Sequence, residues 1–391
     1  MPRLARHFQG LPPYPLTDVP GIKRELLARG VDVIDLGTGD ADLAPPPAAV
    51  AALREAVLDP ANSRYAFQLG LVEFREEIAR WMRGRFGLEV DPMRELLPLV
   101  GSKEGIFHLP FAFLERGDMT VMPDPGYQAY LGGTVLAGGE AHLVPLRPEN
   151  DFLIPLDEIP ADVVKRTRIL YLNYPNNPTA AVAPREYLER CVEFCREHDI
   201  ILAYDNAYSE IAYDGYVPPS ILEIPGAREV AIEFHSLSKT YNMTGWRAGW
   251  AVGNPELISA LQRVKSFSDT GVPFSIQHAG AAALRSHAEW VPRNVETFRI
   301  RRDAAYECLR AAGFDVPCPA ASMYLWVPLP EGVASEPWAR RLLLEQGVAV
   351  LPGKSLGAGG EGFFRIALTT SEERLREAAG RIARMVETAA V

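Results

Sequence analysis

The sequence predicts an α/β protein that has a large domain and a smaller α+β domain. In the large domain, a mostly parallel seven-stranded sheet is expected between two layers of helices. The chain has 391 residues, 48% of them hydrophobic, which is enough for a large core and too long for one ordinary domain. Short apolar runs alternate with longer helical patterns, as in sheets with helical crossovers. Several runs are apolar at successive positions, which is typical of strands covered on both faces.

The predicted strands follow one another through the middle of the chain. They are LLPLV (96–100), MTVMP (119–123), AHLVPL (141–146), RILYLN (168–173), IILAYD (200–205), VAIEFHS (230–236) and RAGWAVG (247–253). Helical patterns lie between them at 103–117, 184–199 and 254–267. Pro184 opens the second pattern, and we expect it in the first helical turn, where its missing N–H is not needed.

The domain limits are predicted from the two ends of the chain. VDVIDLG (31–37) has the pattern of one more strand, so the segment 1–40 is expected to pack with the small domain. The large domain is predicted over 41–284. A helical pattern followed by the strand patterns MYLWVPL and FFRIALT predicts the small domain over 285–391.

Composition excludes several classes of protein. The net charge of −10 opposes a broad nucleic-acid surface, and no run of 18 apolar residues could span a membrane. The first 21 residues contain five prolines and lack the apolar core of a signal peptide. Cys191, Cys195, Cys308 and Cys318 have no histidines at ligand spacing, so we expect reduced, buried thiols and no metal. A soluble cytoplasmic protein is predicted.

Polar residues gather where the predicted strands end. Asp205, Ser236 and Lys239 lie at or just beyond strand ends, and so does the turn NYPNNP (173–178). In open α/β sheets, ligands bind at the carboxyl ends of the strands. The sequence therefore predicts a ligand site at this edge.

Each polar residue has an ordinary structural explanation and a functional one. GSKEG (101–105) follows a strand and opens a helix, which suits a phosphate, although an ordinary helix cap explains it as well. Asp205 could cap the next helix, or it could keep a proton on a heteroaromatic nitrogen. Lys239, with Arg247 eight residues on, could be a surface charge or an amine that forms a Schiff base with an aldehyde.

The stretch SLSKTYNMTGWRAGW (236–250) resembles the lysine signature of class I/II aminotransferases. These are the fold-type-I enzymes that use pyridoxal 5′-phosphate. The resemblance covers nearly the whole chain through the ordered motifs GTGDAD, YAFQLGLVEFREEIA, GSKEGI, PDPGY, NYPNNPT, YDNAYSEIAYDG and FFRIAL. Such an ordered series is far more specific than any one motif, and function is then argued from the site.

The resemblance implies a role for each residue around the cofactor ring. Lys239 would bind the cofactor aldehyde and later carry the substrate proton. Asp205 would pair with the pyridinium nitrogen, so that the ring can accept electrons. Tyr208 and Asn177 would hydrogen-bond the ring's phenolic oxygen, and Tyr127 would stack on the ring.

The resemblance also implies how phosphate and substrate are held. The phosphate would be bound by Ser102, Lys103, Ser236, Ser238 and Arg247. Tyr65 would reach the phosphate of a neighbouring subunit, which makes a homodimer with shared active sites part of the expectation. Arg365 would clamp the substrate α-carboxylate with its two-pronged guanidinium, and Gly39 would lie against that carboxylate.

The implied reaction transfers an amino group from an amino acid to a 2-oxo acid by a ping-pong scheme. The stretch 205–254, together with GSKEGI, is most similar to the LL-diaminopimelate aminotransferase branch, whose acceptor is 2-oxoglutarate. Alanine (glutamate–pyruvate), N-succinyl-diaminopimelate and aspartate aminotransferases remain alternatives. A β-eliminating C–S lyase on the same cofactor is a further rival. A non-enzymatic DNA-binding regulator is opposed by the acidic balance and by the early start of the aminotransferase pattern.

Two positions depart from the family pattern. Ala180 stands where the family commonly has glycine after NPT. If this position needs a positive φ, alanine there costs about 1 kcal/mol. The stretch AFQLGLVEFR after Tyr65 lacks the usual glycine near its start, which leaves the contacts to a partner subunit less well defined.

Overall fold

The computed structural model describes residues 3–12, 19–67 and 69–387. Its main sheet has the strand order β2-β8-β7-β6-β5-β3-β4, in which only β8 runs antiparallel to its neighbours. The strands are β2 (Leu96–Leu99), β3 (Met119–Asp124), β4 (Glu140–Pro145), β5 (Thr167–Leu172), β6 (Ile201–Asp205), β7 (Ala231–Ser236) and β8 (Gly249–Gly253). The mostly parallel seven-stranded sheet is therefore confirmed. The predicted limits of the other strands differ from the observed ones by one residue, and the largest difference is at β8, where Arg247 precedes the strand and has a φ of 57°.

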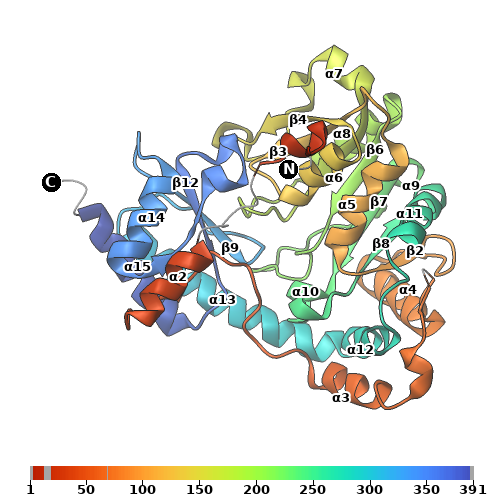
Figure 1. The fold of residues 1–391 in the computed structure, drawn as a ribbon, viewed down its shortest axis with the longest axis horizontal. Coiled ribbons are helices and arrows are strands. Elements are labelled where there is room, and N and C mark those ends of the chain that lie inside the picture. The colour runs from red at the N-terminus through yellow and green to blue at the C-terminus, as the bar shows by residue number, and fades with distance from the viewer. Residues whose placement is uncertain (1–2, 13–18, 68, 388–391) are drawn as a thin grey trace.

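Helices cover both faces of this sheet (Figure 1). The described helices are α1 (Arg6–Gln9), α2 (Val19–Ala28), α3 (Pro47–Ala56), α4 (Val72–Phe86), α5 (Ser102–Phe113), α6 (Gln128–Leu136), α7 (Ala161–Arg166), α8 (Arg185–Glu197), α9 (Ala227–Val230), α10 (Leu237–Thr240), α11 (Pro255–Ser268), α12 (Phe274–Arg285), α13 (His287–Ala311), α14 (Ser335–Gln346) and α15 (Glu372–Glu387). Pro184 lies one residue before α8, as its N-cap, rather than in the first turn as predicted.

The sheet is buried on both sides, which explains its continuous apolar runs. Ile169 and Tyr171 of β5 pack in a cluster with α5, α6 and α11. Leu170 and Leu172 of the same strand point the other way, into a cluster with α4, α8 and α12. Because successive side chains of a strand face opposite sides, a strand with two covered faces needs apolar residues at every position.

A second, antiparallel sheet has the order β11-β12-β9, formed by Leu351–Pro352, Phe363–Ala367 and Tyr324–Pro328. Figure 1 shows it beside α14 and α15, with α13 running between this region and α12. The N-terminal strand β1 (Ile34–Asp35) pairs with β10 (Val348–Ala349), and Leu26 of α2 packs on the same region. The first helix differs from the rest of the N-terminal segment, because α1 contacts α6, which covers the large sheet. The domain limits themselves stay a prediction.

The cysteines are not all buried, contrary to the prediction. Cys191 and Cys195 are buried in α8, whereas Cys308 is half-buried and Cys318 is exposed. Cys318 lies in the loop between α13 and β9, outside the packed core, so the prediction was wrong for this thiol. Among the described residues, no helix is long and apolar enough to cross a membrane, and no cluster of His, Cys, Asp and Glu is arranged for a metal.

Candidate active site

A cavity of about 470 Å³ lies where the carboxyl ends of the parallel strands face the second sheet. All of the predicted site residues except Tyr65 line it, namely Gly39, Ser102, Lys103, Tyr127, Asn177, Asp205, Tyr208, Ser236, Ser238, Lys239, Arg247 and Arg365. The structure thus brings together residues that are spread over more than 300 positions of the sequence. Tyr65 is 69% exposed and does not line this cavity.

Lys239 is delivered into the cavity by the short helix that follows β7. The hydroxyl of Ser236 caps this helix by accepting a hydrogen bond from the Ser238 N–H at 3.1 Å. The half-buried Lys239 donates from Nζ to the Gly39 carbonyl oxygen at 2.5 Å. The amine is therefore held at one place in the cavity by a backbone acceptor, unlike that of a surface lysine.

Asp205 ends β6 and carries an oxygen that has no partner. Its Oδ2 accepts a hydrogen bond from the Tyr130 hydroxyl at 2.9 Å, while Oδ1 is buried and unpaired within the described chain. Burial raises the pKa of Asp205 to about 6, although the bond from Tyr130 opposes this rise. A buried acceptor that lacks a donor is costly, so this oxygen fits a ligand that brings an N–H or a positive charge.

Arg247 lines the end of the cavity that is predicted to hold the phosphate, and Gly101 lies against its guanidinium. Arg247 donates to the Thr244 carbonyl oxygen at 2.9 Å, and this fixes its guanidinium beside the first turn of α5. Gly101 has a φ of 74°, and a Cβ there would overlap Nη2 of Arg247. Only glycine tolerates the positive φ and also leaves room for the Arg247 guanidinium, which explains the first residue of the GSKEG motif. Ser102 then starts α5, and the N-terminus of a helix suits an anion.

Arg365 projects from β12 into the cavity. Nη1 donates to the Asn177 side-chain oxygen at 2.7 Å, and Nη2 donates to the Gly37 carbonyl oxygen at 2.8 Å. Nε is buried and has no hydrogen-bond partner in the part of the chain that the structure describes. An arginine fixed in this way, with donor capacity left over, suits a carboxylate.

Two aromatic side chains complete the predicted set. Tyr127 is the N-cap of α6, and the amine of Lys103 lies 5.8 Å from the centre of its ring. The hydroxyl of buried Tyr208 lies 3.1 Å from that of Tyr324.

The turn after β5 answers the question raised by Ala180. Ala180 has a φ of 59°, so the left-handed conformation that favours glycine is present at this position. Its N–H donates to the Asn176 carbonyl oxygen at 3.0 Å, which closes the turn next to Asn177.

Sequence reasoning missed several residues that line the cavity or touch it, among them Tyr130, Tyr324, Gln128, Thr38 and Thr244. Tyr130 had a usable signal, because it follows Tyr127 at the three-residue spacing of one helix face. Tyr324 had none, since a tyrosine that starts a buried strand looks like ordinary core.

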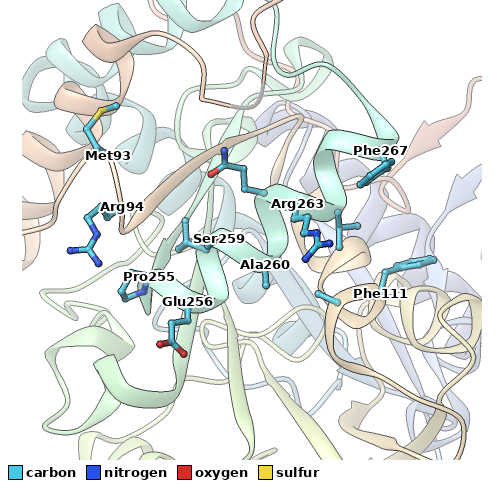
Figure 2. Close-up of a pocket in the computed structure, with 13 residues that line it drawn as sticks. Met93, Arg94, Phe111, Pro255, Glu256, Ser259, Ala260, Arg263 and Phe267 are labelled. Atoms are coloured by element: carbon cyan, nitrogen blue, oxygen red, sulfur yellow. The ribbon is translucent and has the colours of Figure 1, made fainter.

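A larger hollow of about 900 Å³ lies elsewhere, along the outer side of α11. Figure 2 shows Arg263, Phe267 and Phe111 at one end of it, with Met93 and Arg94 at the other. Phe267 is 90% exposed, and none of the unpaired buried polar atoms of the described chain belongs to this lining. The chemistry therefore points to the cavity at the sheet edge and not to this hollow.

The chain is similar to known proteins over nearly its whole length. The LL-diaminopimelate aminotransferase of Nitratidesulfovibrio vulgaris is 48% identical over 98% of this chain and 99% of its own length. The solved structure of substrate-bound BacF from Bacillus subtilis covers 98% of both chains with a TM-score of 0.94 at 32% identity. That of a probable N-succinyldiaminopimelate aminotransferase from Thermus thermophilus has a TM-score of 0.90 at 41% identity, over 94% of this chain and 98% of its own.

The family model for aminotransferase class I and II matches residues 31–382, which span both sheets and every residue that lines the cavity. The match therefore covers the fold and the site together. The chain belongs to the aminotransferase class I and II family.

Proposed function

We propose that this protein is a pyridoxal-phosphate-dependent LL-diaminopimelate aminotransferase that uses 2-oxoglutarate as its acceptor and works in the cytoplasm. The observation that carries the substrate assignment is the 48% identity to a protein of that name over nearly the whole chain. The complete cavity supports the reaction class, because it combines an amine, a buried carboxylate, an anion end and a carboxylate-binding arginine. Free cysteines suit the reducing cytoplasm.

The residues present fit the cofactor. The unpaired Oδ1 of Asp205 would accept from the pyridinium nitrogen, and the phosphate would be held by Ser102, Ser236, Ser238 and Arg247. Lys239 would bind the aldehyde carbon. When bound, the cofactor supplies an electron sink for the charge that develops at the substrate α-carbon.

Lys239 would act as the proton carrier of the reaction. In its neutral form, Nζ takes the proton from the substrate α-carbon as a general base. The Gly39 carbonyl oxygen limits where Nζ can lie. Since the lysine belongs to a helix anchored directly on β7, its reach is set by the sheet and not by a free loop. A second substrate, the 2-oxo acid, then takes the amino group, so the two substrates share one cavity in turn.

Arg365 would orient both substrates. The α-carboxylate is common to the amino acid and the 2-oxo acid, so one arginine can serve both half-reactions. Asn177 and Gly37 fix the guanidinium before the substrate arrives. A preoriented arginine reduces the entropy that binding would otherwise cost.

A homodimer is part of the proposal, because Tyr65 is exposed and lies outside the cavity of its own chain. Tyr65 belongs to a segment with further exposed apolar side chains, including Leu58 at 82% and Phe67 at 62%. A segment that exposes several large apolar side chains is typical of an interface. We propose that the partner subunit covers this segment and that Tyr65 then contacts the partner's phosphate.

The function is tested by absorbance spectroscopy of the purified protein loaded with pyridoxal phosphate. LL-diaminopimelate should abolish the near-visible band of the Lys239-bound cofactor, and 2-oxoglutarate should restore it. Lys239→Ala should lack the response to the amino acid. A band that does not change on addition of LL-diaminopimelate would refute the substrate assignment. The absence of any band would refute the assignment of pyridoxal phosphate as the cofactor.

The same assay separates the alternatives. Alanine, aspartate and N-succinyl-LL-diaminopimelate are tested as donors at equal concentration, and the correct donor is the one with the highest rate of band loss. A C–S lyase would instead release pyruvate and ammonia from cystathionine without any acceptor. We expect no such release.

A further inference from the structure

Tyr324 touches two residues of the site that are otherwise separate. It is the first residue of β9 and is buried, with 2% of its surface exposed. Its hydroxyl oxygen lies 3.1 Å from that of Tyr208. The face of its ring lies against Arg365, whose Cζ is 4.1 Å from the ring centre. One side chain thus contacts both the proposed carboxylate arginine and the tyrosine proposed for the cofactor ring.

The backbone leaves a space for this hydroxyl at Gly39. A Cβ at Gly39 would overlap the Tyr324 oxygen, so any other residue there would displace the tyrosine. Gly39 also presents its carbonyl oxygen to Lys239. The absence of a side chain at Gly39 therefore has a local reason that does not involve substrate.

The charges around the two hydroxyls make them unequal. Burial pushes the pKa of Tyr324 upward, but the positive charges of Arg365 and Lys239, together with the hydrogen bond to Tyr208, hold it below its usual value against the opposing charge of Asp205. Burial and the neighbouring Tyr324 raise the pKa of Tyr208 well above the usual value. Tyr324 is thus the more acidic phenol of the pair.

We propose that Tyr324 is a positioning residue for the transamination proposed above, acting on the cofactor side through its hydroxyl and on the substrate side through its ring. Since Tyr208 has one hydroxyl proton and would donate it to the phenolic oxygen of the cofactor, the Tyr324 hydroxyl would be the donor between the two tyrosines. The ring holds the guanidinium of Arg365 by a cation–π contact. This inference rests on the proposed function, but one of its tests uses protein without the cofactor.

Two substitutions separate the two contacts. Tyr324→Phe removes the hydroxyl and keeps the ring, whereas Tyr324→Leu removes both. Tyr187→Phe is the matched control, because Tyr187 is also buried and hydrogen-bonded, to the Ile154 carbonyl oxygen, but lies outside the cavity. A purely structural role would lower the melting temperature of all three variants and change neither of the first two readouts below.

The first readout is the pH midpoint of the near-visible band of the cofactor-loaded protein. Donation by Tyr208 favours the form with negative charge on the ring oxygen, so weakening it in Tyr324→Phe should raise the midpoint by about 0.5 to 1 pH unit. In a Tyr208→Phe background, the same substitution should add no shift, because the hydroxyl that it acts through is gone. An unchanged midpoint in Tyr324→Phe would overturn the hydroxyl contact.

The second readout is binding of 2-oxoglutarate to the pyridoxal form, measured by calorimetry. Without an amino group in the system, this ligand binds but does not turn over. Tyr324→Leu should weaken binding by about 2- to 30-fold, the range of one cation–π contact, and Tyr324→Phe should stay within about 2-fold of the wild type. Equal binding by Tyr324→Leu and the wild type would overturn the ring contact.

A third readout uses cofactor-free protein and keeps the two proposals distinguishable. Ultraviolet difference titration should show one phenol that ionises below the usual pKa of tyrosine in the wild type and is absent in Tyr324→Phe. Identical titrations would overturn the acidic Tyr324. If instead the wild type forms no cofactor band while this titration behaves as expected, then the proposed function fails and the acidic Tyr324 stands.

Discussion

Tyr130 and Asp205 are joined by a buried hydrogen bond of 2.9 Å that occupies only one of the two carboxylate oxygens. The second oxygen has no partner among the described residues. The bond fixes the rotation of the carboxylate, so the free oxygen is oriented before any ligand arrives. The arrangement favours ligand binding but lowers the stability of the ligand-free protein, because a buried carboxylate with one unpaired oxygen is unfavourable.

Asp205→Asn is therefore expected to stabilise the cofactor-free protein at neutral and alkaline pH. The folded-state pKa of about 6 lies above the ordinary value of 3.8, so the wild type is most stable below pH 4 and loses stability as the pH rises through 6. The loss amounts to about 3 kcal/mol at pH 8. Asparagine cannot ionise and avoids this loss.

The measurement is urea unfolding of both cofactor-free proteins at pH 5 and pH 8. The advantage of Asp205→Asn should fall by about half at the lower pH. The exposed Asp157→Asn serves as the matched control and should show no such pH-dependent gain. A variant that is less stable than the wild type at pH 8 would contradict the prediction. Transaminase activity should be lost in Asp205→Asn whatever its stability.

Ala180→Gly should stabilise the protein by about 1 kcal/mol. The φ of 59° strains alanine by about 1–2 kcal/mol, and the greater chain entropy of glycine offsets part of the gain. Ala181→Gly is the neighbouring control and should destabilise, because Ala181 is not among the residues with positive φ. Thermal unfolding of the two variants should therefore shift in opposite directions. Equal shifts would show that the turn relaxes around Ala180.

The strands of the large sheet were predictable because burial on both faces leaves an unbroken apolar run, as in Ile169 to Leu172. The residues predicted to hold a phosphate were found for a similar reason, since Gly101 and Arg247 lie in short motifs with strict local requirements. In each case the signal is local in the sequence.

Other features depend on contacts between distant segments and leave no local trace. Tyr130 and Tyr324 are buried tyrosines, and only the fold shows that one touches Asp205 and the other touches Arg365. The left-handed φ of Arg247 lies within a stretch whose apolar pattern predicted a strand. Such positions are where local pattern and site requirements conflict.

Gly101→Ala should weaken cofactor binding far more than it weakens the fold. Alanine would be strained at a φ of 74° and would push Nη2 of Arg247 away from the phosphate end. Losing a charged hydrogen bond corresponds to a roughly 10- to 100-fold increase in the dissociation constant for pyridoxal phosphate. Gly84→Ala is the control, because a Cβ there meets open space within α4 and should slightly stabilise the helix. Fluorescence titration with the cofactor measures both, and equal affinities would contradict the phosphate assignment.

Mixing two inactive variants tests whether Tyr65 acts across a subunit interface. Lys239→Ala removes the proton carrier, and Tyr65→Ala removes the side chain that lies outside its own chain's cavity. If Tyr65 serves the partner, a mixed dimer contains one site with Lys239 and Tyr65 both intact. Random exchange of equal amounts then makes half of the dimers mixed, each with one of its two sites complete, so activity should return to about one quarter of the wild type.

The recovery must require subunit exchange. The variants are therefore mixed once after brief treatment with mild denaturant and once without, and activity should appear only where subunits have exchanged. If Tyr65 acted within its own chain, the Tyr65→Ala subunit would keep a defective site in every dimer and no activity would return. The exposure of Tyr65 and its apolar neighbours favours the first outcome, because a side chain that serves its own cavity would be expected to line it.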